Sequence, residues 1–375
     1  MDKERLQAAE ELCYLLSCAV SGRTPDADRC ASMELRSVYL LAREHKLTAC
    51  AAFALERCME LPRPFDQDKK KSIRRLALFD LERAQIVQGL EERGIRYLPL
   101  KGILLKDCYP KAAMREMSDN DLLCDSGRME DIRELMEGLG YTTEMFGMYH
   151  HDTYSKPPTL EFEMHGMLFE DRKEPVFYSY YREIKDRLIK DDGNAYGYHM
   201  TREDFYVYML AHMYHHYSHA GTGLRSLLDI FVYRRRFPDL DADVLARELQ
   251  TLGLTDFERD TRELAERLFD GEPLSEEEQK ALAFFAGSGA YGTLENAEYQ
   301  RLLTKLGDDS AESKRRYFRE RIFMPREVME EQYPFFARHR ALVPALLVYR
   351  LGRAVVHPRR VSGELRRVKR FKKRK

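Results

Sequence analysis

Hydrophobic positions in the first quarter of the chain recur with helical spacing. Residues 4–21 and 32–61 carry this spacing, with breaks at Pro25 and at Pro62-Arg63-Pro64. A further helix is predicted from about Asp66 to Arg93, followed by Gly94 as a left-handed cap. The pattern therefore predicts a helical N-terminal region over residues 1–93.

Short apolar runs replace the helical spacing after Gly94 and predict four strands: Ile95–Leu100, Asp121–Cys124, Tyr141–Met145 and Thr159–His165. Two helices are predicted between them, one from Gly102 to Cys108 that Tyr109-Pro110 ends, and one from about Ser126 to Leu139. This order is typical of a small mixed sheet with helices packed on it, so residues 94–200 are predicted to form an α/β core.

Helical spacing returns at Thr201, which is expected to cap a helix over Asp204–Ala220. A turn at Gly221–Gly223 separates it from a helix over Leu224–Arg236. Residues 201–357 are thus predicted to be helical. The expected fold class is α+β, a small mixed β-sheet core with helical N-terminal and C-terminal regions.

Composition adds limits to this picture. The chain has 375 residues, 44% of them hydrophobic and 33% charged, and no apolar run approaches the roughly 18 residues that span a membrane. Its start leads into an amphipathic pattern instead of a signal-peptide core. The seven cysteines are scattered without a Cys-x-x-Cys pair, which fits reduced thiols. A cytoplasmic location is the prediction.

Charge is unevenly placed along the chain. Residues 358–375 hold ten Lys or Arg and one Glu, a net charge of +9, so the other 357 residues carry −10 of the total of −1. This basic tail is predicted to meet a polyanion, either nucleic acid or an anionic membrane surface. The simpler alternative is a solubilising helix end, or one that docks on the acidic body.

Two acidic residues, Asp119 and Asp121, give the most informative chemical signal. If the run from Asp121 is a strand, the Asp-x-Asp spacing puts both carboxylates on one face of its leading edge. Neighbouring carboxylates repel unless a cation lies between them, and magnesium prefers oxygen ligands and substrate phosphates. Turn and cap chemistry remains the alternative for this Ser-Asp-Asn-Asp segment.

A third acid lies on the last predicted strand. Glu161, Glu163 and His165 share one face of it by alternation, and a carboxylate on a neighbouring strand can hold a metal and act as a base. Glu163 is the candidate ligand. Glu161 is its rival if the register differs by one pair, and a solvent-facing strand is the alternative without function.

Basic residues that suit phosphate surround these acids. Gly102 at a predicted helix start lets backbone N–H groups approach an anion, and Lys101 adds a point charge, although an ordinary strand-to-helix turn would look the same. Arg115 is expected either to reach phosphate or to pair with Asp119.

Four histidines crowd one predicted helix: His212, His215, His216 and His219. Their i, i+4 spacing can serve a transition metal, but packing by hydrogen-bonded histidines is the more ordinary interpretation. We expect His212 and His216 to face the α/β core.

These motifs together resemble a known family. Leu100-Lys101-Gly102, Tyr109-Pro110, Arg115 and Ser118–Leu123 are similar to the signature of the uncharacterised bacterial nucleotidyltransferase family, a branch of the DNA polymerase beta-like superfamily. Further segments fit the same family: Glu161–His165, the helix with His212 and His216, Leu224–Asp229, Phe323–Arg326 and Leu342–Pro344. The resemblance therefore covers the chain from about residue 35 to about residue 355. Ile103 departs from the superfamily pattern, which places Ser or Gly there.

The resemblance implies transfer of a nucleoside monophosphate from a nucleoside triphosphate such as ATP to an unidentified acceptor, with release of pyrophosphate. Asp119, Asp121 and Glu163 would hold Mg²⁺, with Mn²⁺ as a possible substitute. Lys101, Gly102, Arg115, His165, His212 and His216 would bind the substrate. Two other classes stay open: a catalytically silent nucleotide-sensing or nucleic-acid-binding module, and a metal-dependent phosphohydrolase.

Overall fold

The computed structural model describes residues 3–171, 174–294, 296–297, 302–303, 310–322, 329, 342–344 and 346. The chain forms two compact units, residues 1–217 with 221–292, and residues 218–220 with 293–375. The second unit contains helix α15 (Ala311–Ile322). The predicted basic tail over residues 358–375 and the segment Phe323–Arg326 lie outside the described residues.

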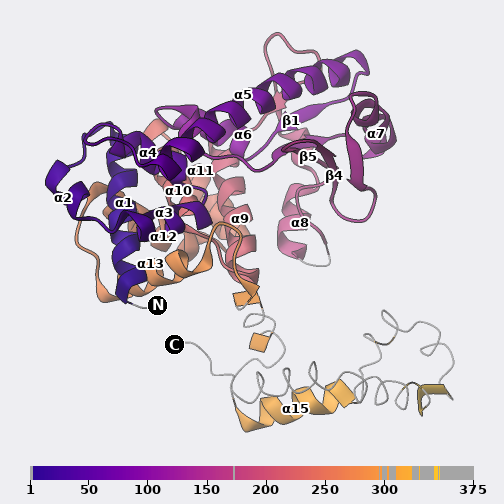
Figure 1. The fold of residues 1–375 in the computed structure, drawn as a ribbon. Coiled ribbons are helices and arrows are strands. Elements are labelled where there is room, and N and C mark those ends of the chain that lie inside the picture. Colours follow the sequence, from indigo (N-terminus) through magenta and orange to yellow (C-terminus); the bar gives the residue numbers. More distant parts are fainter. Residues whose placement is uncertain are drawn as a thin grey trace. The chain divides into compact units, whose positions relative to one another are not determined.

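The first unit begins with a helical region (Figure 1) that consists of α1 (Lys3–Ser21), α2 (Ala27–Ser32), α3 (Leu35–Glu44) and α4 (Thr48–Leu55). The first predicted helix is confirmed, but the predicted helical stretch over residues 32–61 is broken. His45, Lys46 and Leu47 separate α3 from α4, and Lys46 takes a positive φ of 56°. No glycine or proline marks this break in the sequence, which is why the helical spacing alone missed it.

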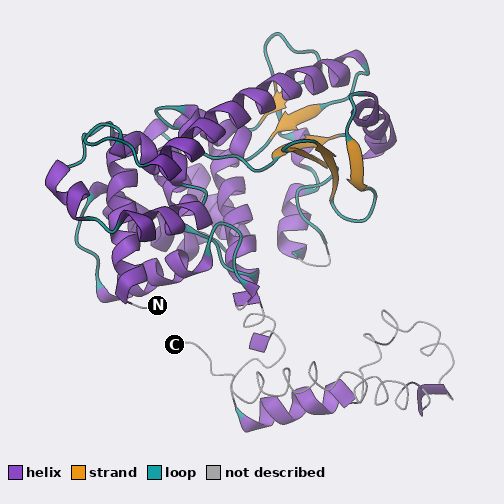
Figure 2. Ribbon diagram, in the orientation of Figure 1, coloured by secondary structure: helices purple, strands orange, loops and turns teal. Residues whose placement is uncertain are grey.

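A long helix, α5 (Arg63–Glu92), then leads into a five-stranded sheet (Figure 2). Its strands are β1 (Tyr97–Pro99), β2 (Asn120–Cys124), β3 (Thr142–Met145), β4 (His151–Lys156) and β5 (Leu160–His165), in the order β1-β2-β5-β4-β3. Only the central β2–β5 pair is parallel. The four predicted strands are confirmed with shifted ends, whereas β4 was not predicted.

The two faces of this sheet differ. One face packs on α5 and on α7 (Met129–Gly138) through a core that contains Phe79 and Phe162, whose rings contact edge to face with centroids 5.8 Å apart. Leu98 and Leu123 alternate to the other face and join the larger core of the helical region. Because side chains alternate along a strand, Asp121 and Glu163 also lie on this second face.

Six α-helices follow the sheet in the described part of the first unit. They are α8 (Pro175–Tyr181), α9 (Arg202–His219), α10 (Leu224–Arg236), α11 (Ala242–Leu252), α12 (Thr255–Asp270) and α13 (Glu276–Ser288), and a small hairpin of β6 (Ile189–Lys190) and β7 (Tyr198–His199) precedes α9. Among these helices, α12 and α13 pack on α1 while α10 packs on α12. Thr201 caps α9 as predicted, because its Oγ1 accepts a hydrogen bond from the Asp204 N–H at 3.0 Å. The result is the predicted α+β class with helical flanks.

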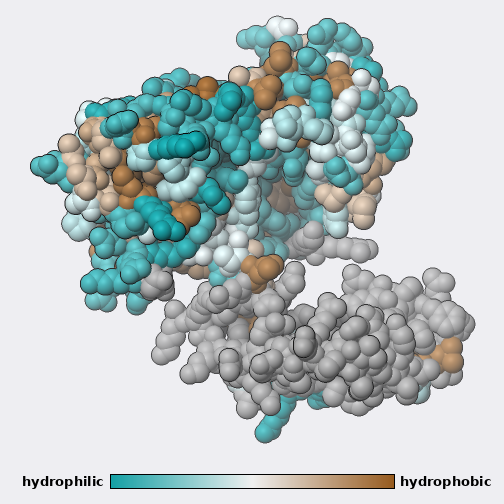
Figure 3. Space-filling view, in the orientation of Figure 1, coloured by the Kyte–Doolittle hydropathy of each residue, from teal (hydrophilic) through white to brown (hydrophobic). Residues whose placement is uncertain are grey.

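Among the described helices, none combines the length and apolarity needed to cross a bilayer. The face of the first unit in Figure 3 is mostly hydrophilic, with hydrophobic residues scattered in small groups. Such isolated apolar residues are normal on a protein surface.

Candidate active site

Asp119 and Asp121 lie at the start of β2, in the middle of the sheet. Asp121 belongs to the strand and is 2% exposed, while Asp119 immediately precedes the strand and is only partly buried. Lys101 Nζ donates to Asp121 Oδ1 at 2.7 Å, and His165 Nε2 lies 3.1 Å from the same oxygen. Asp119 makes no hydrogen bond or ion pair with any described residue. Asp121 therefore has two basic side chains as direct partners, whereas Asp119 has none among the described residues.

These surroundings shift the pKa values of the two acids in opposite directions. Burial opposes ionisation of Asp121, but Lys101 and His165 outweigh burial and hold the pKa of this carboxyl well below its usual range. Burial, and next the charge of Asp121, raise the pKa of Asp119 to about 6. Asp121 is thus an anion with two protein partners, and Asp119 is an acid without a hydrogen-bonded or ion-paired partner among the described residues.

Glu163 lies beside Asp121 on the neighbouring parallel strand. The register of β2 and β5 pairs Asp121 with Glu163 and Leu123 with His165. One ligand atom from each of Asp121, Glu163 and His165 falls within a group whose members are within 4.8 Å of one another. Glu161, the rival candidate, is exposed and does not line the cavity next to these residues. Of these two candidates, Glu163 is the one that lines the cavity.

Lys101 and Gly102 form a tight turn next to the acids. Lys101 has a φ of 44°, an unusual conformation for a residue with a Cβ, and it directs its amine to Asp121. Strained backbone of this kind is concentrated at functional sites. The predicted helix after Gly102 is one α-helical turn, α6 (Gly102–Leu105), followed by a 3-10 helix over Lys106–Cys108.

Arg115 does not pair with Asp119, which was one of its two predicted roles. Its guanidinium makes two hydrogen bonds of 2.9 Å to the carboxylate of Asp229 on α10, and Tyr109 donates to Asp229 Oδ1 at 2.8 Å. A Cβ on Gly102 would lie 2.6 Å from Arg115 Nη1. Gly102 is therefore needed for the close approach of Arg115. The pairing was not predicted because Asp229 lies 114 residues further along the chain.

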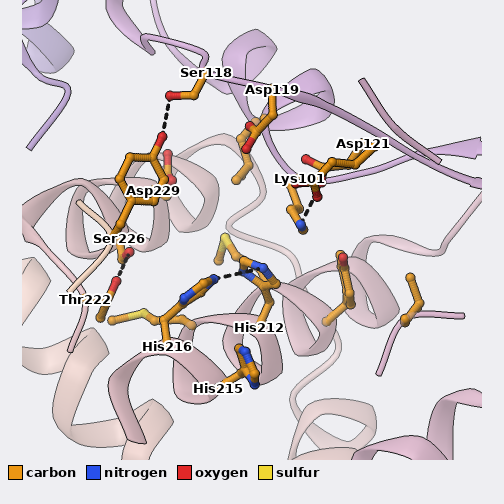
Figure 4. Close-up of a pocket in the computed structure, with 18 of the residues that line it drawn as sticks. Lys101, Ser118, Asp119, Asp121, His212, His215, His216, Thr222, Ser226 and Asp229 are labelled. Atoms are coloured by element: carbon orange, nitrogen blue, oxygen red, sulfur yellow. Dashed lines mark hydrogen bonds and ion pairs between the residues drawn. The ribbon is translucent and has the colours of Figure 1, made fainter. Parts of the chain in front are cut away.

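A cavity of about 400 Å³ opens in front of these residues. Figure 4 shows Asp119, Asp121 and Lys101 on one side of it, facing His212 and His216 of α9 on the other. His212 Nε2 and His216 Nε2 are 3.3 Å apart, and burial, then Lys101 and His216, hold the pKa of His212 well below its ordinary value. All nine predicted site residues line this cavity.

Two cavity residues that the sequence did not single out are His150 and His151. They precede and begin β4, and their rings stack edge to face with a centroid separation of 4.6 Å. Each ring also lies near His165, with centroids 5.4 Å and 5.0 Å away. The His-His dipeptide was the available signal, but it became informative only once β4 was placed against β5.

The pKa values of these three histidines are shifted in different directions. Burial, followed by the neighbouring His165, lowers the pKa of His150 to about 4, and burial lowers that of His151. Burial would also lower the pKa of His165, but its hydrogen bonds to Asp121 and Glu163 outweigh burial and raise it.

Carboxylates on the adjacent strands β2 and β5 thus face one cavity. The chain matches the family model described as "Uncharacterised nucleotidyltransferase" over residues 32–270. It belongs to this family and hence to the transferase class that the family represents. No curated protein matches the chain.

One solved structure matches in part. It is described as the "Crystal structure of tRNA nucleotidyltransferase complexed with a primer tRNA and an incoming ATP analog". The sequence identity is 16%, the match covers 76% of this chain and 99% of that chain, and the TM-score is 0.20. At this TM-score the likeness carries no argument about the present site.

Proposed function

We propose that this chain transfers a nucleoside monophosphate from a nucleoside triphosphate to an acceptor nucleophile, with a divalent metal ion and release of pyrophosphate. The observation that carries the proposal is that three acids, Asp119, Asp121 and Glu163, line one cavity of about 400 Å³. A cavity of this volume is within the range of small-ligand pockets, about 300–1,000 Å³.

The donor set of this site suits Mg²⁺ or Mn²⁺. Asp119 has no partner among the described residues, and its pKa of about 6 reflects burial and the charge of Asp121, both of which a bound cation would offset. Carboxylate oxygens are the ligands these hard ions prefer. Asp119, Asp121 and Glu163 would hold the ion, which would neutralise charge on the phosphates of the substrate.

The remaining residues would position Asp121 and the substrate and would compensate the charge of Asp121 and of the phosphates. Lys101 and His165 both contact Asp121 Oδ1, so they keep this acid ionised and fix its orientation. Glu163 would assist deprotonation of the acceptor. Lys101 and Gly102 would border the phosphates, Arg115 would orient the Gly102 turn from its anchor on Asp229, and His212 with His216 would line the opposite side of the substrate.

The test compares two glutamates on one strand. Glu163→Gln removes a proposed ligand, whereas Glu161→Gln changes an exposed residue two positions away that does not line the cavity. Pyrophosphate release from ATP would be measured with Mg²⁺ and with a cell extract that supplies acceptors. We expect at least about a hundredfold loss for Glu163→Gln, equivalent to about 2.7 kcal/mol, and near wild-type release for Glu161→Gln.

A binding experiment makes this test independent of the acceptor. Mg²⁺-dependent binding of a non-hydrolysable ATP analogue, measured by calorimetry, should weaken at least about tenfold in Glu163→Gln and stay unchanged in Glu161→Gln. Equal behaviour of the two variants in both measurements would rule out the assigned role of Glu163.

A further inference from the structure

Three histidine rings meet on the sheet side of the cavity: His150, His151 and His165. One nitrogen from each falls within a group whose members lie within 4.8 Å of one another. All three rings line the cavity, and His150 and His151 have side chains 23% and 18% exposed, so a small ion can reach them. This group contains no acid, whereas the neighbouring group of Asp121, Glu163 and His165, which shares His165 with it, contains two.

The spacing within the cluster matches the edge of a tetrahedral site. His150 Nε2 and His151 Nδ1 are 3.2 Å apart. Zinc–nitrogen bonds of about 2.0–2.1 Å in a tetrahedron put two ligand nitrogens about 3.3–3.4 Å apart. The third ring, His165, would close the remaining distance by a small movement, because its nitrogen lies within the 4.8 Å group.

His165 supplies an independent observation that points to a ligand. Its Nε2 faces Asp121 and Glu163, whereas its Nδ1 is buried and has no hydrogen-bond partner among the described residues. His165 is 2% exposed, so bulk water does not satisfy this atom. A buried polar atom without a partner needs an explanation, and a metal ion is one that fits an imidazole nitrogen.

Carboxylates outside the cluster already orient its rings. Glu170 Oε1 is 3.0 Å from His150 Nδ1, which directs the Nε2 lone pair of this ring toward His151. Glu163 Oε1 is 3.8 Å from His151 Nε2, so this carboxylate can hold the second ring when its Nδ1 is a ligand. Histidine ligands of metals commonly donate their other N–H to a carboxylate in this way.

We propose that His150, His151 and His165 bind a divalent transition metal of the zinc type, at a site that adjoins the proposed Mg²⁺ site through His165. Three imidazoles are a nitrogen donor set that suits zinc and its neighbours and does not suit magnesium. Three protein ligands leave a fourth position, and the location of the rings in the cavity wall directs that position to the substrate space. The site is therefore of the open type, able to hold water or a substrate atom.

Cobalt titration of the full-length chain tests this inference. Co²⁺ replaces zinc and absorbs strongly in the visible range when it is tetrahedral, but weakly when six oxygens surround it. The titration is run without nucleotide and with excess Mg²⁺ to occupy the carboxylate site. We expect one strongly absorbing Co²⁺ per chain, displaced by Zn²⁺ and not by Mg²⁺.

Variants locate the bound ion. His150→Ala and His151→Ala, tested separately so that one folded variant suffices, should each weaken Co²⁺ binding at least about a hundredfold, and Glu170→Gln should weaken it about tenfold. His199→Ala is the matched control, because His199 is an exposed histidine on β7 whose Nδ1 contacts Asp191 at 2.6 Å and which does not line the cavity. It should bind Co²⁺ like the wild type.

Two results would overturn the inference. One is wild-type Co²⁺ binding in a folded His150→Ala or His151→Ala chain. The other is loss of the absorption in His212→Ala or His216→Ala together with its retention in the His150 and His151 variants, which would place the ion on α9. Because no nucleotide is present, failure of this proposal leaves the proposed nucleotidyl transfer untouched, and failure of that activity leaves the metal measurement valid.

Discussion

The cavity has two walls that use acidic residues in opposite ways. On the helix wall, formed by α9 and α10, Asp229 has both carboxylate oxygens occupied: Arg115 donates to Oδ1 and Oδ2 at 2.9 Å, and Tyr109 donates to Oδ1 at 2.8 Å. On the sheet wall, formed by β2, β4 and β5, Asp119 has no partner among the described residues. The first acid is saturated by protein donors, and the second has no such donor among the described residues.

This contrast separates Asp229 from Asp119. A buried carboxylate with all its lone pairs satisfied stabilises the fold as long as its partners remain, and it offers little to a ligand. An unpaired carboxylate next to another one destabilises the protein and persists where an external cation is bound. The helix wall should therefore respond to mutation in stability, and the sheet wall in activity.

The largest expected effect is on the helix wall. Asp229→Ala leaves the buried Arg115 guanidinium and the Tyr109 hydroxyl without their acceptor, so the free energy of unfolding should fall by about 3–5 kcal/mol. Denaturant unfolding measures it. Asp239→Ala is the control, since Asp239 is exposed and its ion pair with Arg202 at 3.4 Å should contribute little. Equal stability of the two variants would remove the contrast between the walls.

The next effect is on the sheet wall. Asp119→Asn keeps the shape of the side chain but removes a charged ligand, so Mg²⁺-dependent pyrophosphate release should fall by about a hundredfold, or about 2.7 kcal/mol of activation free energy. Its melting temperature should equal or exceed that of the wild type, because the repulsion with Asp121 is relieved. A strongly destabilised variant would show that Asp119 is structural after all.

A pH effect of intermediate size on stability should come from His45, which contacts the start of α10. His45 Nδ1 accepts a hydrogen bond from Leu224 N–H at the start of α10, and Nε2 lies 3.2 Å from the Ala286 carbonyl oxygen. Burial lowers the pKa of His45 to about 4, from an ordinary value of 6.5. Between these values the unfolded chain binds the proton and the folded chain does not, so stability falls as pH decreases.

The size of this effect follows from the two pKa values. Between pH 7 and pH 5 the His45 contribution to the free energy of unfolding should decrease by about 2 kcal/mol. His45→Gln lacks the titrating ring, so its unfolding free energy should depend less steeply on pH over this range. Parallel pH profiles for the two proteins, measured by urea unfolding, would contradict the prediction.

The smallest effect should arise where the two walls meet. Gly102→Ala places a Cβ 2.6 Å from Arg115 Nη1, and the two hydrogen bonds to Asp229 resist displacement of Arg115, so we expect a loss of about 1 kcal/mol in unfolding free energy. Gly138→Ala at the end of α7 meets no atom within 4 Å and should be neutral or slightly stabilising. A neutral Gly102→Ala would mean that Arg115 is not fixed.

The sequence revealed the sheet wall much better than the helix wall. Alternation placed Asp121 and Glu163 on one face of their strands, and the parallel register of β2 and β5 brings them together as expected. Strand β4, with His150 and His151 at its start, was missed because its polar run lacks the alternating pattern of a half-buried strand.

The helix wall depends on contacts between residues far apart in the chain. Arg115 was expected to contact phosphate or Asp119, and its actual partner Asp229 lies on a helix 114 residues away. The hydrophobic periodicity of a helix or strand describes that element alone, so it cannot predict a side-chain contact with another element. The role of His45 could not be predicted for the same reason, since it contacts Leu224 and Ala286, which are far away in the sequence.

Identification of the products of ATP turnover tests the central claim most directly. The full-length chain would be incubated with ATP carrying a label on the α-phosphate, Mg²⁺ and a cell extract, next to the Asp119→Asn variant. We predict pyrophosphate as the released product, transfer of the α-label to an acceptor, and loss of both without Mg²⁺ or in the variant. Release of inorganic phosphate in place of pyrophosphate, or undiminished transfer by Asp119→Asn, would contradict the assignment of the sheet wall as the nucleotidyl-transfer centre.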